Sequence, residues 1–80
     1  MKSSPKLLTF EWNEKDEILE IHGNSKGFLE LSQKLSKLAN KTGNDHDHMM
    51  TPDWGGQELT NEPMNPDNLI INHVKIHKWE

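Results

Sequence analysis

The sequence predicts an α+β fold, in which a single helix packs on one face of a small antiparallel sheet in the order β-β-α-β-β, with one extra short strand as an option. Three observations predict this class. Two short alternating runs are joined by a polar turn, an amphipathic helical stretch follows them, and a β-branched run lies near the carboxyl end. A helix with one apolar stripe is most simply buried across a sheet, which leaves the opposite sheet face open to water or to a partner.

The first two strands are expected at residues 7–12 and 17–22, and the four polar residues between them suggest an antiparallel hairpin. Side chains alternate between the two faces of a strand, so Glu20 and His22 are predicted to point outward. The side chains predicted to point inward are apolar: Leu8, Phe10, Trp12, Leu19 and Ile21.

The helix is predicted to begin after Asn24 or Ser25 and to run to about Asn40. Either residue can cap the helix, because a short side-chain oxygen reaches the unpaired amides of the first turn. Gly43 lies close to the expected end of the helix. The apolar stripe repeats at helical spacing and comprises Phe28, Leu31, Leu35, Leu38 and Ala39.

The carboxyl-terminal half is expected to hold a third strand at residues 46–50, an optional short strand at 57–60, a proline-containing loop at 61–68 and a last strand within 69–79. Alternation in this last run would place two groups of side chains on opposite faces. One group is Ile70, Val74 and Ile76, and the other is Ile71, His73, Lys75, His77 and Trp79.

Length and composition limit the class of protein. Eighty residues are enough for a single domain over residues 1–80, with 1–6 as a flexible tail. The chain has nine basic residues, all of them lysine, against thirteen acidic ones, so an acidic net charge of −4 argues against nucleic acid as a partner. No cysteine is present to form disulfides or thiolate metal sites, and no apolar run suggests a signal peptide or membrane span. We therefore expect a cytoplasmic protein that binds no membrane.

The histidines are the first candidates for chemistry. His46 and His48 would share one strand face, and His73 and His77 would share another if their segment is extended. Such pairs could hold zinc if the two strands are neighbours, with a carboxylate from Asp45, Asp47 or Asp53. Exposed strand histidines more often solvate an edge. The sequence therefore favours no metal and no cofactor, and keeps a metal site at these four histidines as an alternative.

Other catalytic arrangements are weaker. Serines 25, 32 and 36 belong to the helix and its cap, and serines 3 and 4 belong to the terminal tail, so none lies on an exposed nucleophile elbow. Gly55 and Gly56 lack the lysine of a phosphate-binding loop and fit a tight turn instead. We therefore expect no enzyme activity. Trp54, beside these glycines, and Trp79 are better candidates for anchoring a protein partner, because tryptophan is enriched at interface hot spots.

Three sequence stretches carry a family resemblance. The helix with Gly27, Phe28, Leu31, Leu35, Leu38 and Ala39 leads into Asp45-His46-x-His48-Met49 and then Trp54-Gly55-Gly56-x-Glu58-Leu59-Thr60. This succession resembles the immunity protein 32 family of bacterial polymorphic toxin systems, from about the second strand to the carboxyl end. The resemblance implies a small α+β protein that binds a toxin's effector domain and has neither catalytic residues nor a required cofactor. It makes His46, His48, Gly55 and Gly56 signature residues, together with Trp54 and Glu58.

The expected function is therefore that of an immunity protein, which neutralises a cognate toxin by protein–protein contact, and a basic nuclease domain is a candidate for that toxin. The residues expected to bind the partner are two tryptophans and five acids: Trp54, Trp79, Glu20, Asp45, Asp47, Asp53 and Glu58. Two alternatives stay open. One is a histidine-based metal-binding protein or metalloenzyme, and the other is a homodimer formed through a partly apolar outer sheet face that carries Ile18, Ile71 and Trp79.

Overall fold

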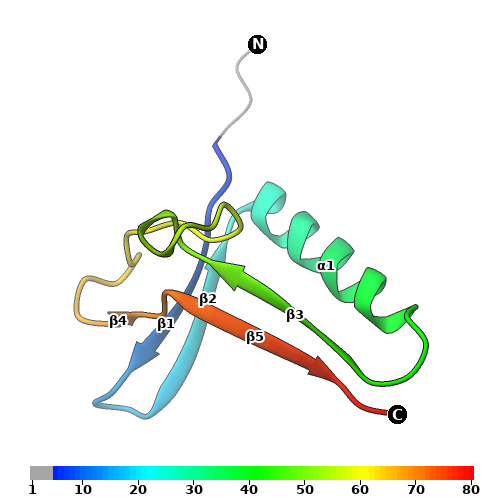
Figure 1. The fold of residues 1–80 in the computed structure, drawn as a ribbon. Helices are drawn as coiled ribbons and strands as arrows, with labels where there is room; N and C mark the ends of the chain where they lie inside the picture. The colour runs from blue at the N-terminus through cyan, green and yellow to red at the C-terminus, as the bar shows by residue number, and fades with distance from the viewer. Residues whose placement is uncertain (1–4) are drawn as a thin grey trace.

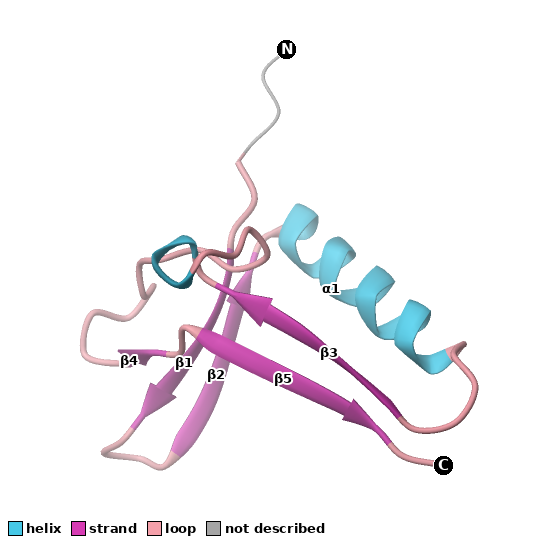
Figure 2. Ribbon diagram, viewed as in Figure 1, coloured by secondary structure: helices cyan, strands magenta, loops and turns pink. Residues whose placement is uncertain are grey.

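A computed structural model describes residues 5–80, and this part of the chain contains one α-helix and five β-strands (Figures 1 and 2). Their order confirms the predicted α+β class. The elements are β1 (Leu8–Asn13), β2 (Ile18–Gly23), α1 (Ser25–Ala39), β3 (Asp45–Met50), the short 3₁₀ turn η1 (Pro52–Trp54), β4 (Leu69–Ile70) and β5 (His73–Lys78). No helix in residues 5–80 has the length and apolar content needed to cross a bilayer. Serines 3 and 4 of the predicted tail lie outside the described residues.

The strands form two antiparallel sheets where the sequence suggested one. The first sheet has the order β2-β1-β4, and the second is the β3-β5 ribbon, which Figure 1 shows beside α1. The last apolar run is divided at residues 71–72, so that β4 pairs with β1 while β5 pairs with β3. The optional strand at 57–60 does not form. That segment nevertheless joins the sheets, because the Leu59 amide donates to the Met50 carbonyl and the Thr60 amide donates to the Leu8 carbonyl.

The helix begins and ends close to the predicted positions. The Asn24 side chain caps it by accepting the Gly27 amide at 2.9 Å, and the same oxygen accepts the Leu7 amide at 3.1 Å. A Cβ placed on Gly27 would lie 1.9 Å from the Leu7 carbonyl oxygen. The amino-terminal turn of α1 is therefore pressed against the chain entering β1, and only glycine permits this approach.

The core is small and lies between the two sheets and the helix. Its buried apolar side chains come from β1, β3 and the segment after η1, and partly buried residues of α1, β5 and the break before β5 pack against them. The first group is Leu8, Phe10, Met49 and Leu59, and the second is Leu31, Ile71, Val74 and Ile76. Ile71 thus points into the core and not onto the outer face with His73, because the break between β4 and β5 interrupts the alternation.

The predicted burial of β2 is wrong, although Ile21 and Leu19 do lie opposite Phe10 and Trp12, on the sheet face that was predicted to be inward. Leu19 and Ile21 are 51% and 44% exposed, whereas Glu20 and His22 are half-buried. The reason is the loop at residues 61–68, which packs over the side of β1 that carries Glu11 and leaves this residue fully buried. Because β2 is an edge strand, its apolar face is only partly covered.

Candidate functional site

The four predicted histidines lie together on the outer face of the β3-β5 ribbon. His46 is directly opposite His77, His48 is opposite Lys75, and the register places His73 opposite Met50. The two strands are therefore neighbours, as the metal alternative required. We call the surface formed by His46, His48, His73, His77, Trp54 and Trp79 the histidine face.

The rings of this face form a continuous line. Along it the ring centroids are 6.3 Å apart for Trp54 and His73, 5.0 Å for His73 and His48, 5.0 Å for His48 and His46, 5.9 Å for His46 and His77, and 6.0 Å for His77 and Trp79. His77 and Trp79 are stacked, with 16° between their planes. Each end of the line is therefore a tryptophan.

The closest contact on the histidine face joins His48 and His73. Nδ1 of His48 lies 2.7 Å from Nε2 of His73, so one ring donates a hydrogen bond to the other. Desolvation lowers the pKa of His48, and the neighbouring His73, His46 and Lys75 lower it further against the opposing effect of Asp47. These surroundings favour the neutral imidazole, whose lone pairs can accept a proton or a metal ion.

Both tryptophans of the histidine face are unusually exposed. Trp54 is 59% and Trp79 is 76% exposed. Large aromatic side chains that stay in water at the two ends of one surface are typical of a protein–protein contact area, because they gain most from burial against a partner.

The acids predicted to bind the partner lie in different places. Asp45 and Asp47 lie on the helix side of β3, where Lys41 and Lys34 reach their carboxylates at 3.3 Å and 3.2 Å. A backbone hydrogen bond from His46, followed by Lys41, lowers the pKa of Asp45. Asp53 is exposed next to Trp54 and so borders the histidine face.

Three of the signature residues hold the turn that carries Trp54. Gly55 has a φ of +86°, which favours glycine, and a Cβ on Gly56 would lie 2.4 Å from the Met50 carbonyl oxygen. The Glu58 carboxylate accepts the amides of Met50 and Gln57, both at 3.1 Å. The backbone conformation at Gly55, the close approach at Gly56 and the two hydrogen bonds of Glu58 explain why glycines and an acid follow the tryptophan.

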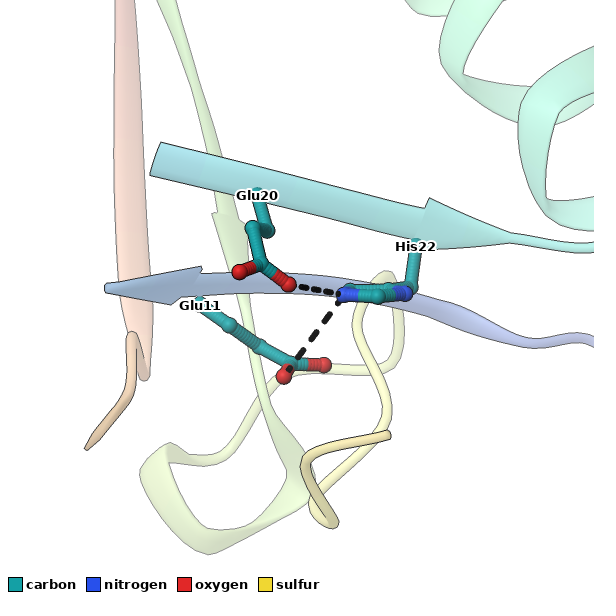
Figure 3. A group of neighbouring side chains, drawn as sticks. All are labelled: Glu11, Glu20 and His22. Carbon is teal, nitrogen blue, oxygen red and sulfur yellow. Dashed lines mark hydrogen bonds and ion pairs between the residues drawn. The ribbon is translucent and has the colours of Figure 1, made fainter. Parts of the chain in front are cut away.

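A second polar cluster lies on the first sheet, at Glu11, Glu20 and His22 (Figure 3). Nε2 of His22 is 2.8 Å from Glu20 and 3.8 Å from Glu11. One ligand atom from each of the three residues lies within 4.8 Å of the others. The sequence analysis predicted that Glu20 and His22 point outward and that Glu20 binds the partner, and it did not identify Glu11 as a structural group. The signal was the alternation of β1 and β2, which puts Glu11 opposite Glu20.

The Glu11 carboxylate is already saturated with hydrogen bonds. Its oxygens accept bonds from the Thr9 hydroxyl, the Met64 amide at 2.8 Å, the Asn65 amide at 3.2 Å and the Asn68 side-chain amide at 3.0 Å. Burial alone would raise the pKa of Glu11, but these four bonds outweigh it and lower the pKa from 4.5 to about 2. A carboxylate with its lone pairs engaged in this way is poorly suited to bind a metal ion. We interpret it as the anchor of the 61–68 loop.

The groove beside α1 offers no comparable chemistry. It has a volume of about 440 Å³ and a floor that includes Leu8, Leu31 and Met49. Charged groups along its rim pair with one another, as Lys6 does with Glu30 at 3.1 Å. Such pairing leaves the rim with little net charge to attract a ligand.

Together these features define a small α+β domain with an exposed aromatic and imidazole surface. The model of a protein family described as immunity protein 32 matches residues 18–74 of the chain. The chain belongs to this family, which confirms the resemblance seen in its sequence. No curated protein and no solved structure matches the chain.

Proposed function

We propose that this protein is an immunity protein that binds a cognate bacterial toxin domain and neutralises it by protein–protein contact, without catalysis of its own. The observation that carries the proposal is the pair of exposed tryptophans at the two ends of the histidine face. Membership of the immunity protein 32 family supplies the class of partner. The proposed place of action is the cytoplasm of the cell that makes the toxin.

The histidine face suits this role because its anchors rest on neighbouring groups before binding. The backbone of Trp54 is held by its amide, which donates to the Thr51 carbonyl at 2.9 Å, its ring lies beside His73, and the ring of Trp79 stacks on His77. A side chain held in place loses less entropy when a partner covers it. Trp54 and Trp79 are therefore the residues we propose as hot spots.

The charge of the chain suggests the sort of surface that it meets. The net charge is −4, and an exposed acid stands beside each tryptophan, Asp53 next to Trp54 and Glu80 next to Trp79. Acids at the rim of an interface speed association with a basic partner. A basic toxin domain such as a nuclease is the partner that we propose on this ground.

The experiment begins with the toxin domain encoded by the adjacent gene, produced together with this chain. A stable complex that abolishes the toxin's activity is the expected result. Trp54→Ala and Trp79→Ala should each weaken binding by about 30-fold, the loss of a hot spot worth about 2 kcal/mol. Leu19→Ala is the matched control, because Leu19 is also an exposed apolar residue but lies on the other sheet.

Two outcomes would count against the proposal. If both tryptophan variants bind the toxin as tightly as the unmodified chain while Leu19→Ala weakens binding, the histidine face is not the interface. If the toxin is not captured and keeps its activity, the immunity role itself fails.

A further inference from the structure

We propose that His48 and His73, with His46 as a third ligand, form a binding site for a divalent transition-metal ion, of which Zn²⁺ is the best fit. The proposal concerns the isolated chain and does not depend on toxin binding. Three observations carry it: the convergence of two ring nitrogens, the place of a third ring beside them, and the charges around the site.

The first observation is the contact between His48 and His73. Their facing nitrogens, Nδ1 and Nε2, are 2.7 Å apart across the two strands. Both nitrogens point at one position, which a shared proton can fill. Zinc bonds of 2.0–2.1 Å at a tetrahedral angle separate two nitrogens by about 3.3 Å. A separation of the nitrogens by about 0.6 Å, together with a tilt of both rings toward a common apex, would therefore let an ion replace the proton.

The second observation is the position of His46. It lies two residues before His48 on β3, so both side chains project from the same face, and their ring centroids are 5.0 Å apart. For His46 to supply the third nitrogen, its ring must turn toward His48 when the ion binds. Three imidazoles and an open fourth position are an established zinc arrangement.

The third observation concerns the charges around the site. Asp45 and Asp47 are held on the opposite side of β3 by lysines, so they are not its ligands. Lys75, directly opposite His48, is the cation on the same strand face. This lysine opposes any cation, whereas the neutral imidazoles favour a borderline metal ion such as Zn²⁺ over Mg²⁺ or Ca²⁺, which require oxygen ligands.

The contrast with the Glu11 cluster strengthens the choice. There the carboxylate that would be the strongest ligand accepts four protein hydrogen bonds. At the histidine face, the bond that an ion must break joins two rings at the surface, and water can satisfy the nitrogens during exchange. The cost of opening the site is correspondingly small.

The test is calorimetric titration of the purified chain with zinc chloride at pH 7.5, after treatment with a chelator. We expect one zinc ion per chain. His48→Ala and His73→Ala should each lower the affinity at least about tenfold, because even loss of a group behind a ligand costs 10- to 100-fold. His46→Ala should have a smaller effect, and Lys75→Ala should raise the affinity, since it removes a nearby positive charge.

His22→Gln is the matched control. His22 is the one histidine of the sequence that does not belong to the histidine face, and it bonds to Glu20 on the other sheet. It should leave zinc binding unchanged. A second readout uses Ni²⁺, which should quench the fluorescence of Trp54, whose ring lies 6.3 Å from that of His73. Unfolding curves of each variant separate loss of a ligand from loss of the fold.

Absence of zinc binding by the unmodified chain would overturn the proposal, as would unchanged affinity in folded His48→Ala and His73→Ala. Loss of binding in His22→Gln alone would also overturn it and would move the site to the Glu11 cluster. The toxin experiment is carried out in the presence of a chelator, so its outcome is independent of this one.

Discussion

Replacement of Glu11 by glutamine tests how the loop at residues 61–68 is held. Glu11 is fully buried and its carboxylate accepts four hydrogen bonds, two of them from the backbone amides of Met64 and Asn65. Glutamine keeps the shape of the side chain but removes its charge, and its amino group, itself a donor, faces donors where a carboxylate oxygen accepted hydrogen bonds from them. The variant thus approximates the protonated glutamate.

The magnitude of the effect follows from the lowered pKa. The difference between the ordinary value of 4.5 and about 2 in the fold corresponds to about 3 kcal/mol, at about 1.4 kcal/mol for each unit. A domain of this size has a total stability of about 4–12 kcal/mol. Glu11→Gln should therefore lose a large part of it and should lower the melting temperature by about 12–24 °C.

The dependence on pH has a definite sign. Because the pKa of Glu11 is depressed by folding, its contribution is fully present above about pH 4.5 and is lost as the pH falls through about 2. Glu11→Gln has no such group to titrate. The stability difference between the unmodified chain and the variant should be about 3 kcal/mol at pH 6 and should approach zero near pH 2.

Urea denaturation followed by tryptophan fluorescence, repeated at several pH values, measures this difference directly. Glu62→Gln is the matched control, since Glu62 is an exposed acid of the same segment, and it should be as stable as the unmodified chain. A stability difference for Glu11→Gln that is the same at pH 6 and pH 2 would refute the reasoning, because the loss would then not arise from the charge. So would a variant as stable as the unmodified chain.

Two further predictions concern the start of α1, each measured as a free energy of unfolding in urea. Gly27→Ala should cost at least about 2 kcal/mol, because its Cβ would meet the Leu7 carbonyl oxygen at 1.9 Å. Gly43→Ala, with φ at +75° but open space around it, should cost only about 1 kcal/mol, and equal losses would contradict the steric explanation. Asn24→Ala should lose about 1–2 kcal/mol with the cap, and Asn24→Asp should lose less, since it keeps the acceptor. Equal losses in the two Asn24 variants would contradict the capping role.

The local pattern of the sequence predicted most of the elements. The helix was foreseen because Leu31 and Leu38 repeat at helical spacing and Asn24 can cap it. The sequence did not predict the strand register that places His46 opposite His77. It did predict that His46 and His48 share one strand face and that His73 and His77 share another. These features depend on residues close together in the chain, which is why periodicity finds them.

The errors have one common origin in contacts between distant segments. Nothing within the β-branched run at residues 69–79 shows that its first part pairs with β1 and its second part with β3. Similarly, the alternation of β2 cannot reveal that a distant loop covers Glu20 and His22 while Leu19 stays exposed. Long-range packing therefore overrode the burial that alternation suggested, while the pairing of the faces is as predicted.

The segment after β3 links stability to the proposed function. Gly56 and Glu58 bind closely to the backbone of Met50, Leu59 completes the core, and the same turn holds Trp54 in water. A substitution at Gly56 or Glu58 would displace Trp54 without removing it, whereas Trp54→Ala removes the ring and leaves the turn intact. If the turn acts by positioning Trp54, Glu58→Gln should weaken toxin binding in proportion to its loss of stability. Trp54→Ala should weaken toxin binding and leave the free energy of unfolding nearly unchanged. Measured together, the two variants separate the residues that contact the partner from those that hold the contact in place.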